Sequence, residues 1–461
     1  MFDAEKMRSA FLNSDYDRKD LAAMLVKALE KLDKSACEKK DLEVRLEESD
    51  RAAHRQAAPF RIPEKKRKTT RKKPGRETGH AGSYRPQPSH VDEEIDKPLE
   101  GCPHCGGPVH KVKQVEQFIE DIPPTRPRVT RLCTYRGHCP QCGEVRSTHP
   151  LQVSTATGAA KTHLGPNALG LALELTGQHG LERRKTCRIL KSTFGLSITP
   201  GGLIQATHRM ADKLQIPHEA IWQGLREADA AYLDETSWWA GEPGWWLWVG
   251  AHRGATVYAI RRSRGREVVY ELLGTDFPGV LVSDCLATYD DATVLQHKCY
   301  AHHQKAISEA IAQHRNNGKG FLRKMRALLR AAVALKARKP FLPEDEFATR
   351  RQKLEESADR LLDSATVDPL EQRIVNRIRK RRNHLFTFLD HDAVDATNNF
   401  AERQLRPAVI SRKLSCGNRT PRGARTWEVL ATVAVTAAQC AESFRHIVAN
   451  AARLPPKEPA R

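Results

Sequence analysis

The stretch "GVLVSDCLATYD" (residues 279–290) opens with an unbroken apolar run and then reaches an acid, Asp284. Such a run, bounded by a glycine, predicts a strand that is buried on both faces, as in the parallel sheets of α/β proteins. Side chains at the carboxyl end of such a strand emerge into a crevice at the edge of the sheet. We therefore expect an α/β core with Asp284 at the mouth of a crevice.

Three more strand-like runs precede this stretch. They are "AAYLDETSWW" (residues 230–239), "GWWLWVGAH" (residues 244–252) and "ATVYAI" (residues 255–260). The dipeptide Pro-Gly between the first two marks a turn, so the pattern predicts a three-stranded meander. Asp234 follows the apolar start of the first run and becomes a neighbour of Asp284 if their strands pair. Glu235 is an equal candidate for the same role.

A third acid, Glu402, stands among arginines and lysines in "NNFAERQLRPAVISRKLSCGNRTPRGARTWEVL" (residues 398–430). The segment predicts a helix on which Asn398, Glu402 and Arg406 share one face, at i, i+4 and i+8. If the basic residues bind phosphates, an acid among them repels the same ligand unless a metal ion lies between. Glu402 therefore indicates a metal site.

A carboxylate trio on two strands and a helix suits two divalent cations such as Mg²⁺, which retain waters and touch few protein oxygens. Two such ions, about 3.5 to 4 Å apart, activate the attacking oxygen and stabilise the leaving oxygen of a phosphodiester displacement. The residues alone leave other interpretations open. Asp234 also fits an ordinary acid at a strand end, and Glu402 a capping-box glutamate three residues after an N-cap at Asn399.

Residues 96–150 contain two C-x-x-C units, Cys102 with Cys105 and Cys139 with Cys142, separated by 33 residues and each followed by a glycine. Paired units of this kind predict one tetrahedral Zn²⁺, and four protein ligands make the site structural rather than catalytic. The glycines allow turns in which backbone N–H groups face the thiolates. Ordinary buried cysteines are the alternative. Nearby second choices as ligands are Cys133, His104 and His138.

The chain has 461 residues and a formal net charge of +20, which favours several domains and a polyanionic partner such as nucleic acid. It contains no apolar run of about 18 residues, and its first residues lack the apolar core of a signal peptide. We therefore expect a cytoplasmic protein.

The N-terminal part predicts two segments. Residues 1–55 carry leucines at heptad spacing and predict a coiled-coil helix that self-associates, with a single solvated helix as the alternative. Residues 56–95 are basic and rich in Pro and Gly, which predicts an unstructured arm that binds DNA phosphates, or a merely soluble linker. The DNA-binding candidates of the arm are Lys65, Lys66, Arg67, Lys68, Arg71, Lys72 and Lys73.

Residues 160–220 predict helices, one of which ends at Gly195 while the next starts at Thr199 and Pro200. Two helices joined by a tight turn that contains glycine form a helix-turn-helix-like pattern, with a basic face available for DNA. A plain helical hairpin makes the same pattern.

Residues 316–395 have helical apolar spacing and dense basic residues. They predict an all-helical insertion that interrupts a catalytic core made of residues 225–315 and 396–445. The insertion would bind DNA or organise the protein–DNA complex. The alternative is that it only packs against the core. Residues 446–461 are expected to form a tail.

Four motifs together resemble a known family. "DETSWW" (residues 234–239), "VSDCLATYD" (282–290), "KCYAHHQK" (298–305) and "NNFAERQLRPAVISRKLSCGNRTPRGARTW" (398–427) are similar to the catalytic-domain motifs of the insertion-sequence-66 family of bacterial transposases. That family also carries an N-terminal coiled coil, an arm similar to "KKPGRETGH" and a two-knuckle zinc module. The resemblance covers nearly the whole chain in the same order.

The resemblance implies a ribonuclease-H-like α/β core in a multidomain α+β chain, with a DDE triad at Asp234, Asp284 and Glu402. Family members cut the 3′ ends of their element and join them to target DNA with two Mg²⁺ or Mn²⁺ ions. The implied partners are double-stranded DNA, further copies of the chain and accessory proteins of the same element, in the bacterial nucleoid. The basic residues expected to bind DNA around Glu402 are Arg403, Arg406, Arg412, Lys413 and Arg422.

Cys299 and His302 match a C-x-x-H motif seen near the second aspartate of many related transposases, so with Asn398 they are expected to support the active site. Cys285 departs from the pattern, because a glycine usually follows the second aspartate. The change is harmless if the backbone there has a negative φ. The competing functions are a zinc-containing coiled-coil DNA-binding regulator without catalytic activity, and a nuclease or resolvase of the same fold.

Overall fold

The structure is a computed structural model that describes residues 79–454, except 83, 124, 153–161, 314–319 and 365–367. The expected coiled coil and the seven basic candidates from Lys65 to Lys73 lie outside the described residues. The chain divides into two compact units between Gln87 and Pro88, and everything that follows concerns the second unit.

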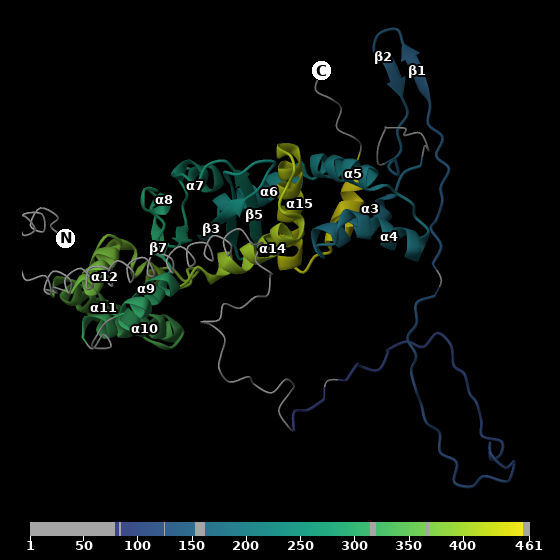
Figure 1. Ribbon diagram of the computed structural model, residues 1–461, viewed down its shortest axis with the longest axis horizontal. Helices are drawn as coiled ribbons and strands as arrows, with labels where there is room; N and C mark the ends of the chain where they lie inside the picture. The colour runs from purple at the N-terminus through teal and green to yellow at the C-terminus, as the bar shows by residue number, and fades with distance from the viewer. Residues whose placement is uncertain are drawn as a thin grey trace, which may run out of the picture. The chain divides into compact units, whose positions relative to one another are not determined.

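The second unit contains a five-stranded mixed sheet with the strand order β5-β4-β3-β6-β7 (Figure 1). β3 (Ala230–Trp238), β4 (Trp245–His252) and β5 (Ala255–Arg261) pair antiparallel, as the predicted meander requires. β6 (Val280–Ser283) pairs parallel with β3, and β7 (Gln296–Lys298) pairs parallel with β6. The fold is therefore mixed α/β, as the buried run at residues 279–290 predicted.

The pairing of β3 with β6 aligns the first two acids. Tyr232 lies opposite Val282 in the parallel register. The same register, continued by two residues, brings Asp234 level with Asp284. The sequence predicts that Asp234 and Asp284 are neighbours if their strands pair, and β3 and β6 do pair.

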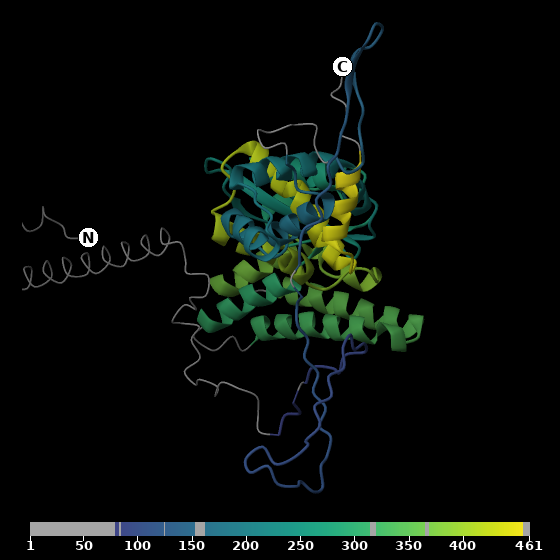
Figure 2. The ribbon, with the colours of Figure 1, turned by 90° about the vertical axis from the view of Figure 1, so that its right-hand side faces the viewer.

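Helices cover both faces of the sheet (Figures 1 and 2). Alternate residues of β3 supply the two cores: Tyr232 faces one and Leu233 the other. This two-sided burial is the physical reason for the nearly continuous apolar runs in the strands. The helices on the Tyr232 face include α14 (Asn399–Ser415) and α15 (Pro421–Gln439), and those on the Leu233 face are α6 (Gln215–Arg226), α7 (Arg266–Leu273) and α8 (Ala287–Asp290).

The described part of residues 160–220 is largely helical, and the predicted break at Gly195 and start after Thr199 are both present. The helices are α3 (Pro166–Gly177), α4 (Arg183–Phe194) and α5 (Pro200–Lys213), followed by α6. α4 ends at Gly195, whose φ of 68° is a left-handed conformation that glycine adopts without strain. α5 begins after Thr199, whose hydroxyl accepts a hydrogen bond from the Gly202 N–H at 3.0 Å.

These helices share a core with the end of the chain. α3 packs against α16 (Phe444–Arg453), and α5 packs against both α15 and α16. Residues 446–453, expected to belong to a tail, are therefore helical. Phe444, Val448 and Ala452 form an apolar stripe at i, i+4 and i+8 that is buried, which the mixed composition of the segment concealed.

The described residues between β7 and α14 are mostly helical. Figure 2 shows these helices, in green, as one layer. None of the described helices combines the length and apolar composition needed to cross a membrane. The helical elements of this region are α9 (Tyr300–Gln313), α10 (Phe321–Arg338), η2 (Lys339–Phe341), α11 (Glu344–Asp363), α12 (Pro369–Arg379), η3 (Arg382–His384) and α13 (Thr387–Asp390).

Candidate active site

Two acids lie side by side where β3 and β6 meet. Asp234 is the fifth residue of β3, and Asp284 directly follows the last residue of β6. Both are half-buried. One carboxylate oxygen of Asp284 accepts a hydrogen bond from the Leu286 N–H at 2.8 Å, and one of Asp234 accepts from the Glu235 N–H at 2.9 Å. Each carboxylate is thus fixed to the backbone through one oxygen.

Glu235, the alternative to Asp234, points to the opposite face of the sheet. Its side chain is only 2% exposed, and Arg264 lies 2.7 Å from one carboxylate oxygen. The hydroxyl of Tyr289 donates to the other oxygen. Because both oxygens are used inside the protein and alternate strand residues face opposite sides, Glu235 is accounted for as a structural ion pair.

Glu402 lies in the first turn of α14 and is exposed. Its N–H donates to the carbonyl of Asn398 at 3.2 Å. Asn398, and not Asn399, is the N-cap residue, and no side-chain hydrogen bond caps this helix. The capping-box interpretation of Glu402 therefore has no support in the observed geometry.

The three acids lie within electrostatic reach of one another. Burial raises the pKa of Asp234 to about 7, and repulsion from the carboxylates of Glu235, Asp284 and Glu402 adds to the effect. Carboxylate oxygens are the ligands that Mg²⁺ and Mn²⁺ prefer, and a divalent cation among these acids would favour their ionised forms. The chemistry of the donors therefore suits a hard divalent metal, but among the described residues the three carboxylates do not form a group close enough to hold one.

Three hydrogen bonds tie together the elements that carry the acids. The Cys299 N–H donates to the carbonyl of Ser283 at 2.9 Å, and the Cys299 sulfur accepts from the Asn398 N–H at 3.1 Å. The Asn398 amide donates to the carbonyl of Leu233 at 2.7 Å. Leu233 and Ser283 directly precede Asp234 and Asp284. Cys299 and Asn398 thus connect the middle of β3 and the end of β6 to the start of α14.

The environment of Cys299 suits this structural contact. The residue is fully buried, and burial raises the pKa of its thiol. A neutral thiol is a weak metal ligand, because metals bind the thiolate. His302 lies one turn further along α9, half-buried, and its Nδ1 has no hydrogen-bond partner among the described residues.

Cys285 is accommodated without backbone strain. Among the described residues other than glycine, positive φ values occur at Lys111, Cys416 and Ala441, and Cys285 is not one of them. Its sulfur lies 3.7 Å from Nε2 of His303. Burial lowers the pKa of His303 to about 3, with Arg377 and Arg381 adding to the shift, so this histidine is neutral at pH 7.

The basic candidates on α14 and α15 fall into two groups. Arg403, Arg406, Lys413 and Arg422 are exposed. Arg412 is half-buried, and its guanidinium donates to the hydroxyl of Thr236 at 3.0 Å and to both the backbone and the side chain of Ser237. Arg412 therefore ties α14 to the end of β3.

Each cysteine pair forms a knuckle-like turn. Gly106 and Gly143, which follow the pairs, have φ values of 75° and 76°. Backbone N–H groups of His104 and Cys105 lower the pKa of the Cys102 thiol, as those of Cys142 and Gln141 do for Cys139. The second turn joins β1 (Arg136–Cys139) to β2 (Gly143–Arg146).

The knuckle turns are formed, but the structure does not bring the four cysteines together. Among the described residues, no three His, Cys, Asp or Glu side chains are grouped closely enough to hold a metal ion. The local geometry within each pair fits two zinc ligands, because N–H groups that face a thiolate stabilise it.

Several buried charged residues were not identified from the sequence. Asp290, Lys298 and Arg381 form a buried network beneath Asp284. Glu428, the second acid of the 398–430 stretch, is buried and binds Arg261 and Arg425. Their sequence signal is weak, because charged residues in a basic chain are usually solvated and their burial follows from tertiary packing.

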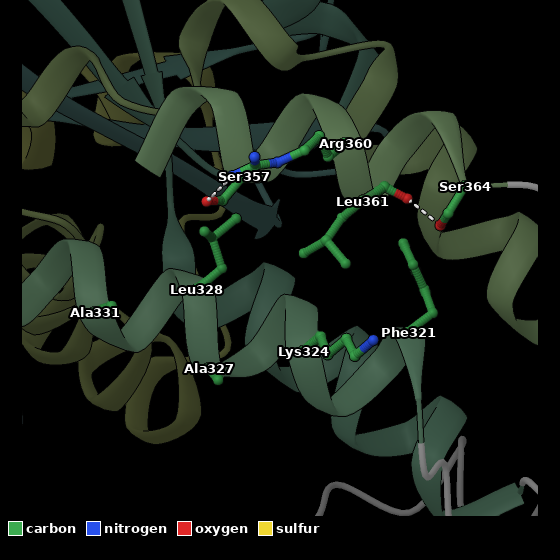
Figure 3. A pocket seen from close by; sticks show the side chains of 9 residues that line it. All are labelled: Phe321, Lys324, Ala327, Leu328, Ala331, Ser357, Arg360, Leu361 and Ser364. Carbon is green, nitrogen blue, oxygen red and sulfur yellow. Dashed lines mark hydrogen bonds between the residues drawn. The ribbon is translucent and has the colours of Figure 1, made fainter. Parts of the chain in front are cut away.

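A cavity of about 640 Å³ lies elsewhere, between α10 and α11 (Figure 3). Phe321, Leu328 and Leu361 project into it, with Lys324 and Arg360 at its margin. None of the three acids lines it. It is therefore separate from the candidate active site.

The molecule is thus a mixed α/β protein in which Asp234 and Asp284 lie side by side where β3 and β6 of the central sheet pair. A family model described as Transposase IS66 family matches residues 161–426, which is more than half of the chain. The chain belongs to this family of transposases, as the motif resemblance indicated. Membership implies DNA binding and a divalent-metal requirement.

The chain is also similar to an uncharacterised protein, y4hP, of Sinorhizobium fredii. The two are 24% identical over 424 aligned positions, and the alignment covers 80% of this chain and 72% of the relative. The similarity extends well beyond the part matched by the family model.

The Asn398 contact predicts a difference between two adjacent residues. Asn398→Ala leaves the buried carbonyl of Leu233 without its partner, so the free energy of unfolding should fall by about 1 to 3 kcal/mol. Asn399→Ala, at an exposed position, should change it by less than about 0.5 kcal/mol. Chemical denaturation of the full chain measures both. Equal effects would contradict the tie between β3 and α14.

Proposed function

We propose that the chain is a DDE-type transposase that cleaves the 3′ ends of its element and joins them to target DNA. Asp234, Asp284 and Glu402 are the proposed ligands of two Mg²⁺ or Mn²⁺ ions. The observation that carries the proposal is the parallel register of β3 and β6, which sets Asp234 level with Asp284. The hydrogen bond from Asn398 to Leu233 fastens the start of α14 to β3, and the charge of Glu402 contributes to the raised pKa of Asp234, which supports Glu402 as the third ligand.

The topology supports a ribonuclease-H-like core. Three antiparallel strands continue through β3 into two parallel strands, and the sheet order is β5-β4-β3-β6-β7. The two proposed parts of the core, residues 225–315 and 396–445, are separated in the chain by the helices of residues 316–395. Functional side chains at the carboxyl ends of the parallel strands are typical of α/β sites.

In the proposed reaction the metal ions and the protein residues have separate roles. When bound, the ions activate the attacking oxygen and stabilise the leaving oxygen of an in-line displacement. The three carboxylates would hold the ions, while Cys299 and Asn398 fix the backbone that carries the carboxylates. Water is the nucleophile in cleavage, and the freed 3′ hydroxyl is the nucleophile in strand transfer.

The exposed face of α14 supports DNA binding beside the acids. Arg403, Arg406 and Lys413 share this face with Glu402, and no acid pairs with them among the described residues. In the helical insertion, by contrast, Arg350 and Arg382 are paired with Glu346 and Asp359. Unpaired exposed cations are the ones available to displace counterions from phosphates.

The C-terminal end of α14 lies near the loop that precedes α4. Leu414 at the end of α14 approaches the loop before α4, where a Cβ on Gly180 would lie 3.7 Å from a Leu414 methyl group. The next turn begins α4 with Arg183, Arg184 and Lys185, all exposed. Twelve residues of helix from Glu402 to Leu414 span about 18 Å, which is about five base pairs of duplex. We infer that α4 contacts the backbone of the cleaved duplex about five base pairs from the cleavage site.

The remaining assignments are also proposals. One structural Zn²⁺ would be held by Cys102, Cys105, Cys139 and Cys142, supported by the two turns whose N–H groups face sulfur. Residues 1–55 would associate as a coiled coil, and the arm at 56–95 would bind DNA. A regulator without catalysis is less well supported, because it assigns no role to the acids whose charges raise the pKa of Asp234.

A strand-transfer assay tests the proposed reaction. With zinc retained and a duplex carrying the element's own end, joined product should form in Mg²⁺ and not in EDTA. Asp284→Asn and Glu402→Gln should each lower the rate at least about a hundredfold, since a lost ligand forfeits several kcal/mol of transition-state stabilisation. Asp291→Asn, at an exposed acid nearby, should retain it. Unimpaired joining by either ligand variant would refute the triad.

The salt dependence of duplex binding tests the α14 surface. Arg406→Gln and Lys413→Gln should each reduce the slope of log K against log salt by about 0.9, the value for one lost phosphate contact. Arg350→Gln, which removes a paired arginine of α11, should leave the slope unchanged. Fluorescence anisotropy in EDTA separates binding from cleavage. Slopes that match the wild type in both α14 variants would remove α14 from the DNA interface.

A further inference from the structure

The turn that carries Asp284 is held on both sides by buried cations. Lys298 Nζ donates to the hydroxyl of Ser283, directly before Asp284, at 3.2 Å. Arg381 Nη2 donates to the carbonyl of Cys285, directly after it, at 3.0 Å. Lys298 is fully buried, and Arg381 is 8% exposed. Contacts sheltered in this way are stronger than the same contacts in water.

One carboxylate fixes both cations. Arg381 donates through Nε and Nη2 to the two oxygens of Asp290, at 3.0 and 2.6 Å. Lys298 Nζ lies 3.2 Å from one of the same oxygens. Asp290 ends α8, six residues after Asp284. The chain from Ser283 to Asp290 is therefore closed into a braced loop around Asp284.

Arg381 reaches this loop from the helical insertion. It lies in the turn between α12 and η3, and its Nη1 also donates to the carbonyl of Arg377 at 3.4 Å. The planar guanidinium meets a carboxylate and a carbonyl at once, which a lysine cannot reproduce. The insertion thus contacts the loop of Asp284 through a specific side chain as well as by packing.

We propose that Arg381 is a positioning residue, through which the helical insertion sets the orientation of Asp284 toward the metal ions. The inference rests on the proposed function, since it assigns Asp284 to metal binding. It gives the insertion a role in organising the site that is separate from any grip on DNA. Removing Arg381 leaves Asp284 in place but frees the Cys285 carbonyl, while Lys298 and Lys380 still contact the two oxygens of Asp290.

The adjacent arginine supplies a matched control. Arg382 donates through Nε and Nη2 to the two oxygens of Asp359, at 2.6 and 3.0 Å. Asp359 belongs to α11, so this pair lies wholly within the insertion. Arg381 and Arg382 therefore have the same chemistry and the same kind of bidentate partner, but only Arg381 contacts the loop of Asp284.

The test compares Arg381→Ala, Arg381→Lys and Arg382→Ala in the full chain. Arg381→Ala should raise the Mg²⁺ concentration for half-maximal cleavage, and weaken Mn²⁺ binding measured by electron paramagnetic resonance, by about 10- to 100-fold. Duplex affinity in EDTA should stay within about twofold, and Arg382→Ala should shift no quantity by more than about twofold. Arg381→Lys keeps the charge and should show a smaller metal shift in a folded chain.

Each outcome has a defined meaning. Equal metal affinities in the Arg381 and Arg382 variants would overturn the inference. Loss of duplex affinity in Arg381→Ala, with unchanged Mn²⁺ binding, would make Arg381 a DNA contact and also overturn it. If the wild type joins no DNA but the Arg381 variants alone lose Mn²⁺ affinity, the positioning role stands and the proposed reaction fails.

Discussion

The parallel pairing of β3 with β6 is the constraint on which the rest of the site depends. Because side chains alternate along a strand, one register places Asp234 and Asp284 level at the carboxyl edge, and a shift by one residue would present Glu235 instead. Glu235 is held on the other face by Arg264 and Tyr289, which reinforces that register. The strand pairing thus decides which acids meet.

Bringing these negative charges together is energetically unfavourable, and the surrounding contacts hold the acids in place. Burial and mutual repulsion raise the pKa of Asp234 to about 7. Against this, Cys299 and Asn398 connect the middle of β3 and the end of β6 to α14, and Asp290 braces the loop of Asp284 through Lys298 and Arg381. A divalent cation would relieve this repulsion, and the three carboxylates would have to come closer together to hold it.

The sequence predicted four strands of the central sheet, the boundary between α4 and α5, and the family, because these depend on local patterns; it did not predict β7. The apolar run before Asp284 and the start of α5 at Thr199 are examples. It did not predict α16, whose burial depends on α3, or the burial of Asp290 and Arg381, which lie 91 residues apart. Pairings of this range arise only when the chain folds, and no local spacing encodes them.

The positions of Mn²⁺ ions in a crystal of the chain, located by anomalous scattering, test the central claim most directly. The proposed function predicts ions bounded by Asp234, Asp284 and Glu402, about 3.5 to 4 Å apart when two are bound. Mn²⁺ at that edge without Glu402, or bound by Glu235 in place of Asp234, would contradict the assignment of the triad. Mn²⁺ found only at other positions would contradict the site itself.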